Sequence, residues 1–315
     1  MSKNKKTAFN DLGLGAKTLS GGYRALNKDG SFNVKKTNIP FLERFNFFHS
    51  LISMPWLHFI ALIIIGYIVV NLLFASIYCW IGVENLTGID GTSAYDKFIE
   101  AFFFSAQTVT TLGYGRVAPI GILANSIAAV ESMLGLLLFA LATGMLYGRF
   151  SRPMGKIKYS SIAVISPYKD INAFMFRVVN PQNNQLLEVE VSVTLSLKRE
   201  NSELRDFYLL ELERSKVVFF PYTWTIVHPI NNLSPLYLLT EAQILAKNAE
   251  FIIMMKGFDE SFSQTVYSRS SYKASEIKWG EKFVYLIKQH EDAINVDIGR
   301  IDETEKVALN ENTIS

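Results

Sequence analysis

Hydrophobic residues are concentrated in the part of the chain before residue 150, whereas residues 156 to 300 are richer in charge. Trp56 to Trp80 is a nearly unbroken apolar run, and Ile120 to Tyr147 is a second one that is rich in glycine and alanine. Each run is long enough to cross the hydrocarbon core of a bilayer, about 30 Å. The first has tryptophans at both ends, where interfacial anchors are common. The pattern predicts two membrane-spanning helices.

A third apolar segment, Phe98 to Ala106, lies between the two runs and is too short to cross a bilayer. We expect Ser93 to Val109 to form about three to four turns of a helix that enters the membrane and stops halfway. The sequence TVTTLGYG, residues 108 to 115, follows. Non-helical backbone at membrane depth is tolerated only where it lines a cavity inside protein. This segment is therefore the first candidate for a functional site.

Glycines at alternate positions suit this segment to a ladder of backbone carbonyls. Gly113 and Gly115 adopt left-handed dihedrals without steric cost, so successive carbonyls can point toward one axis. The oxygen rings would be spaced about 3 Å apart and would replace the water shell of a dehydrated cation. The ligands would be the Thr111 hydroxyl and the carbonyls of Thr111, Leu112, Gly113 and Tyr114. One chain supplies only one wall of such an ion path, so four chains around an axis are implied. The segment resembles the selectivity filter of potassium channels, although taken alone it also fits a turn between two helices.

The region before the first span divides into two parts. Residues 1 to 39 are polar and basic, so we expect a flexible cytosolic arm that can order in part on a neighbouring domain. Residues 40 to 54 are amphipathic, with phenylalanines recurring at helical spacing. Because this stretch leads directly into a span, we favour a helix lying in the membrane interface over a helix packed on a soluble core.

The distribution of charge indicates the orientation of the pore region, residues 55 to 150. Basic residues gather before the first span and after the second, whereas the loop of residues 82 to 96 is acidic. By the positive-inside rule, both termini are expected in the cytoplasm and the loop with the filter outside. No apolar segment follows the lysines of residues 1 to 6, so no cleaved signal peptide is expected.

Residues 151 to 303 alternate between apolar and polar positions, and residues 304 to 315 are expected to form a tail. The alternation, with turns between the strands and one helix at about Thr240 to Glu250, predicts a β-sandwich. No glycine-rich fingerprint of a Rossmann-type nucleotide-binding domain is present. The expected strands are Leu186 to Leu197, Trp224 to Pro229, Phe251 to Lys256 and Lys282 to Ile287, and the expected turns lie at Asn180-Pro181, Asn183-Asn184, Asn231-Asn232 and Gly257.

The chain shows no pattern typical of an enzyme. Its four histidines are scattered, without carboxylates or cysteine at metal-ligand spacing, and no nucleophile and base are paired. His228 falls in an expected strand, where we expect a structural role. Cys79 lies in an apolar helix and has no second cysteine to pair with. We therefore expect no enzymatic activity, no cofactor and no nucleic-acid partner.

Several motifs in the second half resemble the cytoplasmic domain of inward-rectifier (Kir) potassium channels. They are WTIVHPI at 224 to 230, SPLY at 234 to 237, RSSY at 269 to 272 and EIKW at 276 to 279. GFDESFSQ at 257 to 264 and the linker GRFSRP at 148 to 153 are most similar to the prokaryotic, KirBac-like branch. The resemblance implies two transmembrane helices, a re-entrant pore helix, an immunoglobulin-like cytoplasmic β-sandwich and a homotetramer. It also implies K⁺ conduction in a bacterial inner (plasma) membrane.

The resemblance implies roles for individual residues. Tyr147 corresponds to the bulky residue that gates the pore where the inner helices cross. Gly144 permits helix bending, or is only a small packing residue. Basic residues after the second span bind anionic lipid headgroups, or are only flanking charge that sets topology. The cytoplasmic pore is narrowed by Glu260, Phe262 and Gln264, and the basic residues are Arg149, Arg152, Lys156 and Lys158.

The sequence departs from the family pattern at three places. Phe139 stands where strong rectifiers carry an acid, so we expect weak rectification, with block by internal polyamine or Mg²⁺ left to cytoplasmic acids such as Glu260. Gln107 replaces the usual glutamate behind the filter and Arg116 follows the filter, so the supporting ion pair is expected to be absent or rewired. Glu131 lies inside a span, where it is either a functional group or hydrogen-bonded support for the filter.

The main hypothesis is a weakly rectifying, lipid-modulated K⁺ channel. One alternative is a membrane-anchored β-sandwich module for binding or assembly that does not conduct. Another is a nonselective two-span cation channel, which is less favoured because Tyr114 is retained.

Overall fold

The computed structural model describes residues 24–34, 37–38, 40, 47–151, 157–182, 184–200, 202, 204–220, 222–290 and 293–311. The chain divides into two compact units. The pore unit is Asn38–Arg152, and the β unit combines Met1–Thr37 with Pro153–Ser315.

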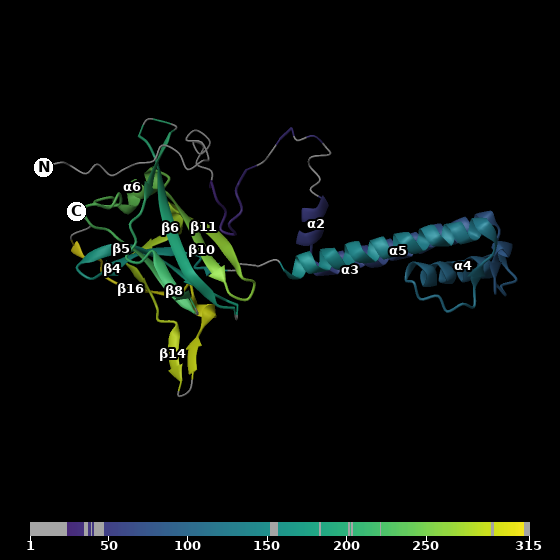
Figure 1. Cartoon of the computed structure of the whole chain (residues 1–315). Helices are drawn as coiled ribbons and strands as arrows, with labels where there is room; N and C mark the ends of the chain where they lie inside the picture. The colour runs from purple at the N-terminus through teal and green to yellow at the C-terminus, as the bar shows by residue number, and fades with distance from the viewer. Residues whose placement is uncertain are drawn as a thin grey trace. The chain divides into compact units, whose positions relative to one another are not determined.

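The described part of the pore unit is helical (Figure 1). Its helices are α2 (Phe47–Ser53), α3 (Trp56–Ile81), α4 (Ala94–Val109) and α5 (Gly121–Phe150). Helices α3 and α5 are long and apolar enough to cross a membrane, and they begin and end within a few residues of the predicted spans. Helix α4 packs against both. Of the predicted interfacial helix, residues 41 to 46 lie outside the described residues, and α2 covers most of the remainder.

Local capping explains where α4 begins. The Ser93 side chain accepts a hydrogen bond from the Asp96 amide, and the Asp96 carboxylate accepts one from the Ser93 amide. This capping box satisfies backbone donors that the first turn of a helix leaves unpaired. Before α4, the short helix η1 (Val83–Asn85) leads into β1 (Leu86–Thr87), which pairs antiparallel with β2 (Ala118–Pro119). The two ends of the loop that carries α4 are thereby joined.

The β unit contains two packed sheets. One has the order β11-β10-β6-β7 with β8 also on β6, and the other has the order β12-β4-β5-β3 with β9 also on β5. Their apolar faces enclose the main core, where Phe174 stacks on Phe251 at 4.1 Å between ring centroids. The first sheet comprises β6 (Leu186–Lys198), β7 (Arg205–Leu209), β8 (Lys216–Phe220), β10 (Glu250–Asp259) and β11 (Gln264–Lys273). The second comprises β3 (Lys158–Tyr159), β4 (Ala163–Tyr168), β5 (Ile171–Val179), β9 (Thr223–Pro229) and β12 (Ile277–Trp279).

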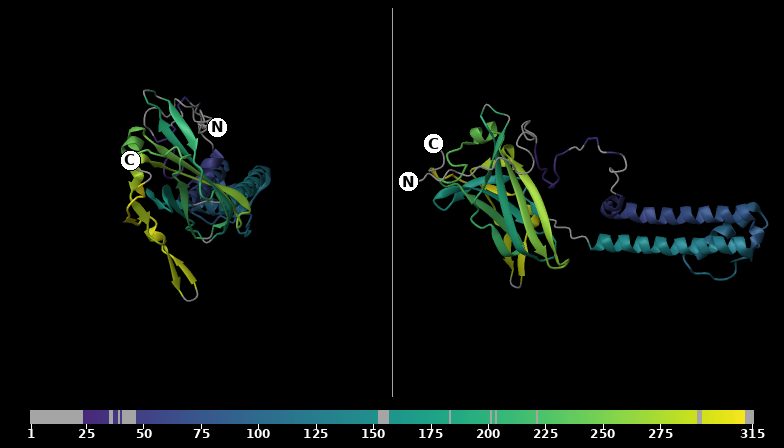
Figure 2. Two further views of the ribbon diagram at one scale, coloured as in Figure 1. Left: turned by 90° about the vertical axis from the view of Figure 1, so that its left-hand side faces the viewer. Right: turned by 45° about the horizontal axis from the view of Figure 1, so that its top comes forward.

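Smaller elements complete the β unit. Helix α6 (Glu241–Ala246) begins with a capping box at Thr240, and the short helices are η2 (Ala274–Glu276) and η3 (Ile298–Arg300). Strand β13 (Glu281–Phe283) pairs with β16 (Thr304–Lys306), so the C-terminal region predicted as a tail contributes a strand. Strands β14 (Ile287–His290) and β15 (Ala293–Val296) form a hairpin that projects from the sandwich (Figures 1 and 2).

Three predictions about the β unit are wrong in detail. Gly257 is not a turn but lies within β10, at a register shift between Lys256 and Phe258. There a Cβ would lie 2.9 Å from a methyl group of Val189, so glycine permits a close approach of two strands. The strand predicted at residues 282 to 287 is broken after Phe283. The predicted helix at residues 240 to 250 ends at residue 246, and residue 250 already begins β10. Of the predicted turns, Asn183 lies outside the described residues.

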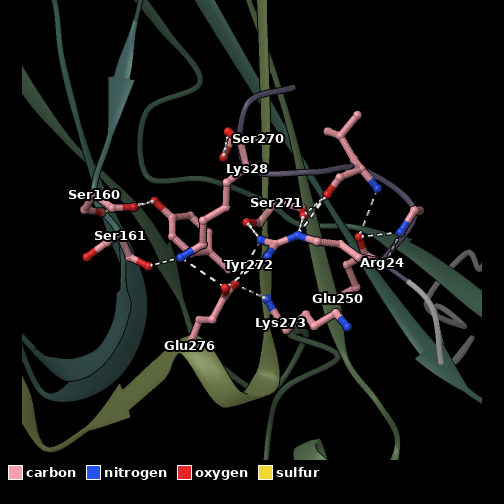
Figure 3. Close-up of polar contacts among 12 residues, drawn as sticks. Arg24, Lys28, Ser160, Ser161, Glu250, Ser270, Ser271, Tyr272, Lys273 and Glu276 are labelled. Carbon is pink, nitrogen blue, oxygen red and sulfur yellow. Dashed lines mark hydrogen bonds and ion pairs between the residues drawn. The ribbon is translucent and has the colours of Figure 1, made fainter. Parts of the chain in front are cut away.

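The described part of the N-terminal arm, residues 24–34, is ordered on the first sheet (Figure 3). Arg24 forms two hydrogen bonds with the Glu276 carboxylate, at 3.0 and 2.9 Å, and also contacts Ser271. The buried Glu250 carboxylate accepts hydrogen bonds from the Ala25 amide at 3.0 and 3.1 Å. Ala25 and Leu26 are buried as well. Of the predicted arm, residues 1 to 23, 35, 36 and 39 lie outside the described residues.

Candidate functional site

The backbone that follows α4 alternates between residues with positive φ angles and residues without them. Thr111, Gly113 and Gly115 have positive φ angles of 58°, 51° and 82°, whereas the intervening Leu112 and Tyr114 do not. Residues that alternate in this way can turn successive carbonyls toward one side of the segment. The glycine positions indicated this alternation, but Thr111 was not expected to take part. A β-branched residue in the left-handed region is strained, at a cost of about 1–3 kcal/mol, and such strain is typical of functional sites.

The C-terminal end of α4 holds this segment. The Leu112 and Gly113 amides donate to the Gln107 carbonyl at 2.8 and 3.3 Å, and the Thr111 amide donates to the Thr108 carbonyl at 3.0 Å. The last carbonyls of the helix are therefore partly satisfied by the filter segment itself. The end of α4 also carries partial negative charge, which favours a cation nearby. Gln107 thus supports the segment through its main chain.

The filter segment is exposed in a single chain. Leu112 is 55% and Tyr114 76% exposed, and the residues from Thr111 to Gly115 are all exposed. A single chain therefore provides one wall of a path and does not enclose it. Backbone carbonyls left bare at membrane depth are costly, so further copies of the chain are needed to complete the site.

Ion pairs hold the segment that leaves the filter. Arg116 contacts Asp90 at 3.0 Å and Glu100 at 3.3 Å, and the Asp90 amide donates to the Glu100 carboxylate at 2.9 Å. Of the two predicted outcomes, an absent or a rewired ion pair, these contacts fit the second, with Glu100 of α4 as one partner of the arginine. Gly88 lies close to this arginine, because a Cβ at Gly88 would lie 1.9 Å from the Arg116 carbonyl oxygen.

A buried polar group connects α4 to both spans. Glu131 of α5 accepts a hydrogen bond from the Tyr78 hydroxyl at 2.6 Å, and its other oxygen lies 2.5 Å from Ser105 Oγ on α4. Ser105 Oγ is also 3.0 Å from Asn71 Oδ1 on α3. All of these residues are fully buried. Of these four residues, only Glu131 was predicted from the sequence. Asn71 and Tyr78 could have been found from their spacing, which places two polar residues on one face of an apolar helix.

Two residues predicted to face the pore lie in the C-terminal half of α5 and are exposed in the single chain. Tyr147 is 74% and Phe139 73% exposed. A Cβ added to Gly144 would meet no atom within 4 Å, so within its own chain this glycine is not required for packing.

Arg149 lies against α2. Its guanidinium donates to the carbonyls of Leu51, Ile52 and Met54 at 2.7, 3.1 and 2.7 Å. It also lies over the rings of Trp56 and Phe59, at 4.6 and 4.5 Å. The structure therefore places this predicted lipid contact at the C-terminal end of a helix. Of the other basic residues, Lys158 is exposed in β3, and Arg152 and Lys156 lie outside the described residues.

In the β unit, the predicted cytoplasmic pore residues meet at one hairpin. Glu260 and Phe262 lie in the turn between β10 and β11, and Gln264 is the first residue of β11. The buried Asp259 carboxylate fixes this turn by accepting hydrogen bonds from the Ser261 amide at 3.0 Å and the Phe262 amide at 3.3 Å.

Charged residues on the same sheet form a network that the sequence analysis missed. Lys256 pairs with Glu190 at 2.7 Å, and Lys216 pairs with Glu188 at 3.2 Å. The side-chain hydrogen bond from Lys256 lowers the pKa of Glu190. Both acids lie on β6, and the lysines lie on its neighbours β8 and β10. Sequence periodicity alone does not align residues on neighbouring strands.

His228 has the expected structural role. It is buried, with its ring nitrogens 2.5 Å from the Glu211 carbonyl and 2.7 Å from Ser234 Oγ. Burial lowers its pKa, which favours the neutral form of the imidazole.

Comparisons with known proteins agree with this arrangement. Residues 26–153 match the model of the inward rectifier potassium channel transmembrane domain, and residues 157–315 match that of the inward rectifier potassium channel C-terminal domain. The chain is 35% identical over 289 residues to inward rectifier potassium channel Kirbac3.1 of Paramagnetospirillum magnetotacticum, which covers 89% of this chain and 95% of that protein. It is 28% identical over 309 residues to G protein-activated inward rectifier potassium channel 2 of Mus musculus, covering 89% of this chain and 71% of that protein. This chain belongs to the inward rectifier potassium channel family, and its likeness to Kirbac3.1 places it near the prokaryotic members.

Proposed function

We propose that this protein conducts K⁺ passively and selectively through a pore formed by four copies of the chain. The observation that carries the proposal is the alternating backbone of residues 111 to 115, anchored on the C-terminal carbonyls of α4. In a tetramer, four such segments supply rings of carbonyl oxygens, together with the Thr111 hydroxyls, that replace the hydration shell of K⁺.

Two constrictions are proposed to control the pore. The first is Tyr147, whose exposed ring would meet its symmetry mates where the inner helices cross and close the path by dewetting. Gly144 would permit the helix bending that separates these rings. The second is the β10–β11 turn, in which Glu260 and Phe262 are presented by a hairpin tied through Asp259.

Rectification is proposed to be weak. Phe139 offers no charge to hold a polyamine in the cavity, and two acids of the first sheet, Glu188 and Glu190, are neutralised by lysines. Internal polyamine or Mg²⁺ would then act mainly at Glu260, by attraction to four copies of an exposed acid.

Lipid modulation is proposed to act through Arg152, Lys156 and Lys158, the basic residues that follow α5. Such residues attract anionic headgroups at the cytoplasmic surface. Arg149 was expected to join them, but its two terminal nitrogens donate to the carbonyls of Leu51, Ile52 and Met54. We further propose that the protein resides in a bacterial inner membrane, with both termini cytoplasmic.

A flux assay tests the function. Purified protein in liposomes should take up rubidium against a K⁺ gradient, and barium should block the uptake. Parallel liposomes with and without anionic lipid report on modulation. Absence of barium-sensitive uptake in both would support a nonconducting membrane-anchored module, and equal uptake of sodium would support a nonselective cation channel.

A further inference from the structure

If Glu131 were ionised, the buried polar residues around it would have fewer hydrogen-bond donors than their contacts require. Asn71 Nδ2 donates to the Tyr67 carbonyl at 2.7 Å, which fixes the orientation of the amide and turns Oδ1 toward Ser105. Ser105 has one hydroxyl proton. Its oxygen nevertheless lies within hydrogen-bond distance of both Asn71 Oδ1 and Glu131 Oε1. If Glu131 were ionised, both of these groups would be acceptors and one would lack a proton.

A proton on Glu131 removes the conflict. Tyr78 then donates to Oε2, Oε1 donates to Ser105, Ser105 donates to Asn71, and Asn71 donates to Tyr67. Every contact in this directed chain has one donor and one acceptor. Within the part of the chain that the structure describes, the two side-chain partners of Glu131 are hydroxyl groups, and the Glu131 side chain is fully buried. A buried carboxylate without a cationic partner is very unfavourable, which argues in the same direction.

A second contact lies one helical turn further along α5. Gly135 is buried, and a Cβ built there would lie 2.2 Å from the Val109 carbonyl oxygen. Glu131 and Gly135 share one face of α5, and their contacts, Ser105 and Val109, share one face of α4. Val109 is the last residue of α4 and immediately precedes the backbone that turns into the filter.

We propose that Glu131 is a neutral acid that donates its proton to Ser105, and that Glu131 and Gly135 together fix the position of α4 against α5. This inference rests on the proposed function, because α4 carries the filter. Both are positioning residues, since they act on the conducting segment through Ser105 and Val109. A rigid α4 holds the Gln107 carbonyl in place for the filter amides.

The decisive variant is Glu131→Gln, because glutamine reproduces the shape and the donor and acceptor of a protonated glutamic acid. We expect it to retain the K⁺ over Na⁺ permeability ratio of the wild type within about twofold. Glu131→Leu and Ser105→Ala remove hydrogen bonds to α4 and should lower the ratio by about tenfold. Ser76→Ala is the matched control, because among the described residues Ser76 Oγ bonds to its own helix, at the Leu72 carbonyl.

Infrared difference spectra report the proton directly. The wild type should show the carbonyl stretch of a protonated carboxylic acid, and Glu131→Gln should lose it. This band is visible whether or not the protein conducts, so failure of the channel function and failure of this inference can be told apart. Absence of the band, or a loss of selectivity in Glu131→Gln as large as in Glu131→Leu, would overturn the protonation of Glu131.

Glycine substitutions test the second contact. Gly135→Ala should displace α4 and lower both the selectivity and the thermal stability of the tetramer. Gly66→Ala is the control in α3, since a Cβ at Gly66 meets no atom within 4 Å. Equal behaviour of the two alanine variants would remove Gly135 from the proposal.

Discussion

Replacement of Arg149 by alanine should release α2 from the pore unit. The described part of α2, Phe47–Ser53, ends next to the Arg149 guanidinium. Its C-terminal carbonyls, together with that of Met54, accept three hydrogen bonds from the Arg149 guanidinium, at 2.7, 3.1 and 2.7 Å. The positive charge also lies at the negative end of the helix.

The size of the effect follows from these contacts. Hydrogen bonds to a charged donor contribute about 1.5–3 kcal/mol each, and the interaction with the helix end adds about 0.3–1 kcal/mol. Contact with the faces of Trp56 and Phe59 adds about 0.5–1 kcal/mol. Even the lowest of these values sum to about 5 kcal/mol. The net loss is smaller, because Arg149 is only half-buried and water satisfies the same carbonyls when α2 opens. We therefore expect a loss of about 2 kcal/mol, which corresponds to roughly 30-fold faster opening of α2.

Hydrogen exchange of the α2 amides in lipid nanodiscs measures this loss. Arg149→Ala should speed exchange in α2 by roughly 30-fold. Arg149→Lys should have an intermediate effect, because lysine keeps the charge but lacks the planar fork that reaches several carbonyls. Ser50→Ala, on an exposed face of α2, is the control. Exchange within about twofold of the wild type in Arg149→Ala would refute the assigned role.

Three further perturbations follow from the structure. Burial raises the pKa of Glu276, but the hydrogen bonds it accepts, from Arg24 first, lower it below the ordinary value. The stabilisation of the arm by Glu276 is therefore present at neutral pH and is lost as pH falls through the lowered pKa. Amide protection of residues 24–34 should be constant down to about pH 5 and fall below about pH 4. Arg24→Ala should abolish this protection at every pH. Gly88→Ala should lower the melting temperature of the tetramer, since Gly88 has a φ of 77° and a Cβ there would meet the Arg116 carbonyl; an unchanged melting temperature would contradict the close approach. Phe139→Glu should introduce steep block by internal spermine in current-voltage curves, whereas Phe139→Leu should not; strong block in the wild type would contradict weak rectification.

Much of the pore unit could be predicted because the bilayer sets element lengths. The spans were placed within a few residues, since an apolar run of bilayer length admits few other interpretations. The start of α4 was also accessible, because Ser93 and Asp96 form a capping box that is visible in the sequence. The positive φ of Thr111 could not be predicted, because it opposes the intrinsic preference of threonine and is imposed by the contacts with α4.

Predictions were wrong where one residue type suits two kinds of local structure, or where packing between distant segments determines which strands and helices meet. Gly257 was taken as a turn, but glycine also permits the strand irregularity that the structure shows. The stretch from residue 282 to 287 has strand-like alternation, yet its two ends pair with different partners, β16 and β15. The contacts of Glu131 with Tyr78 and Ser105 join three helices. Helical periodicity gives the face of each helix but not which faces meet.

The reversal potential of the reconstituted protein under bi-ionic conditions tests the central claim most directly, with K⁺ on one side of a planar bilayer and Na⁺ on the other. The carbonyl ladder at residues 111 to 115 predicts a potential shifted far toward the K⁺ equilibrium value, with current abolished by barium. A potential near zero, with Na⁺ carrying current as readily as K⁺, would contradict the proposed filter.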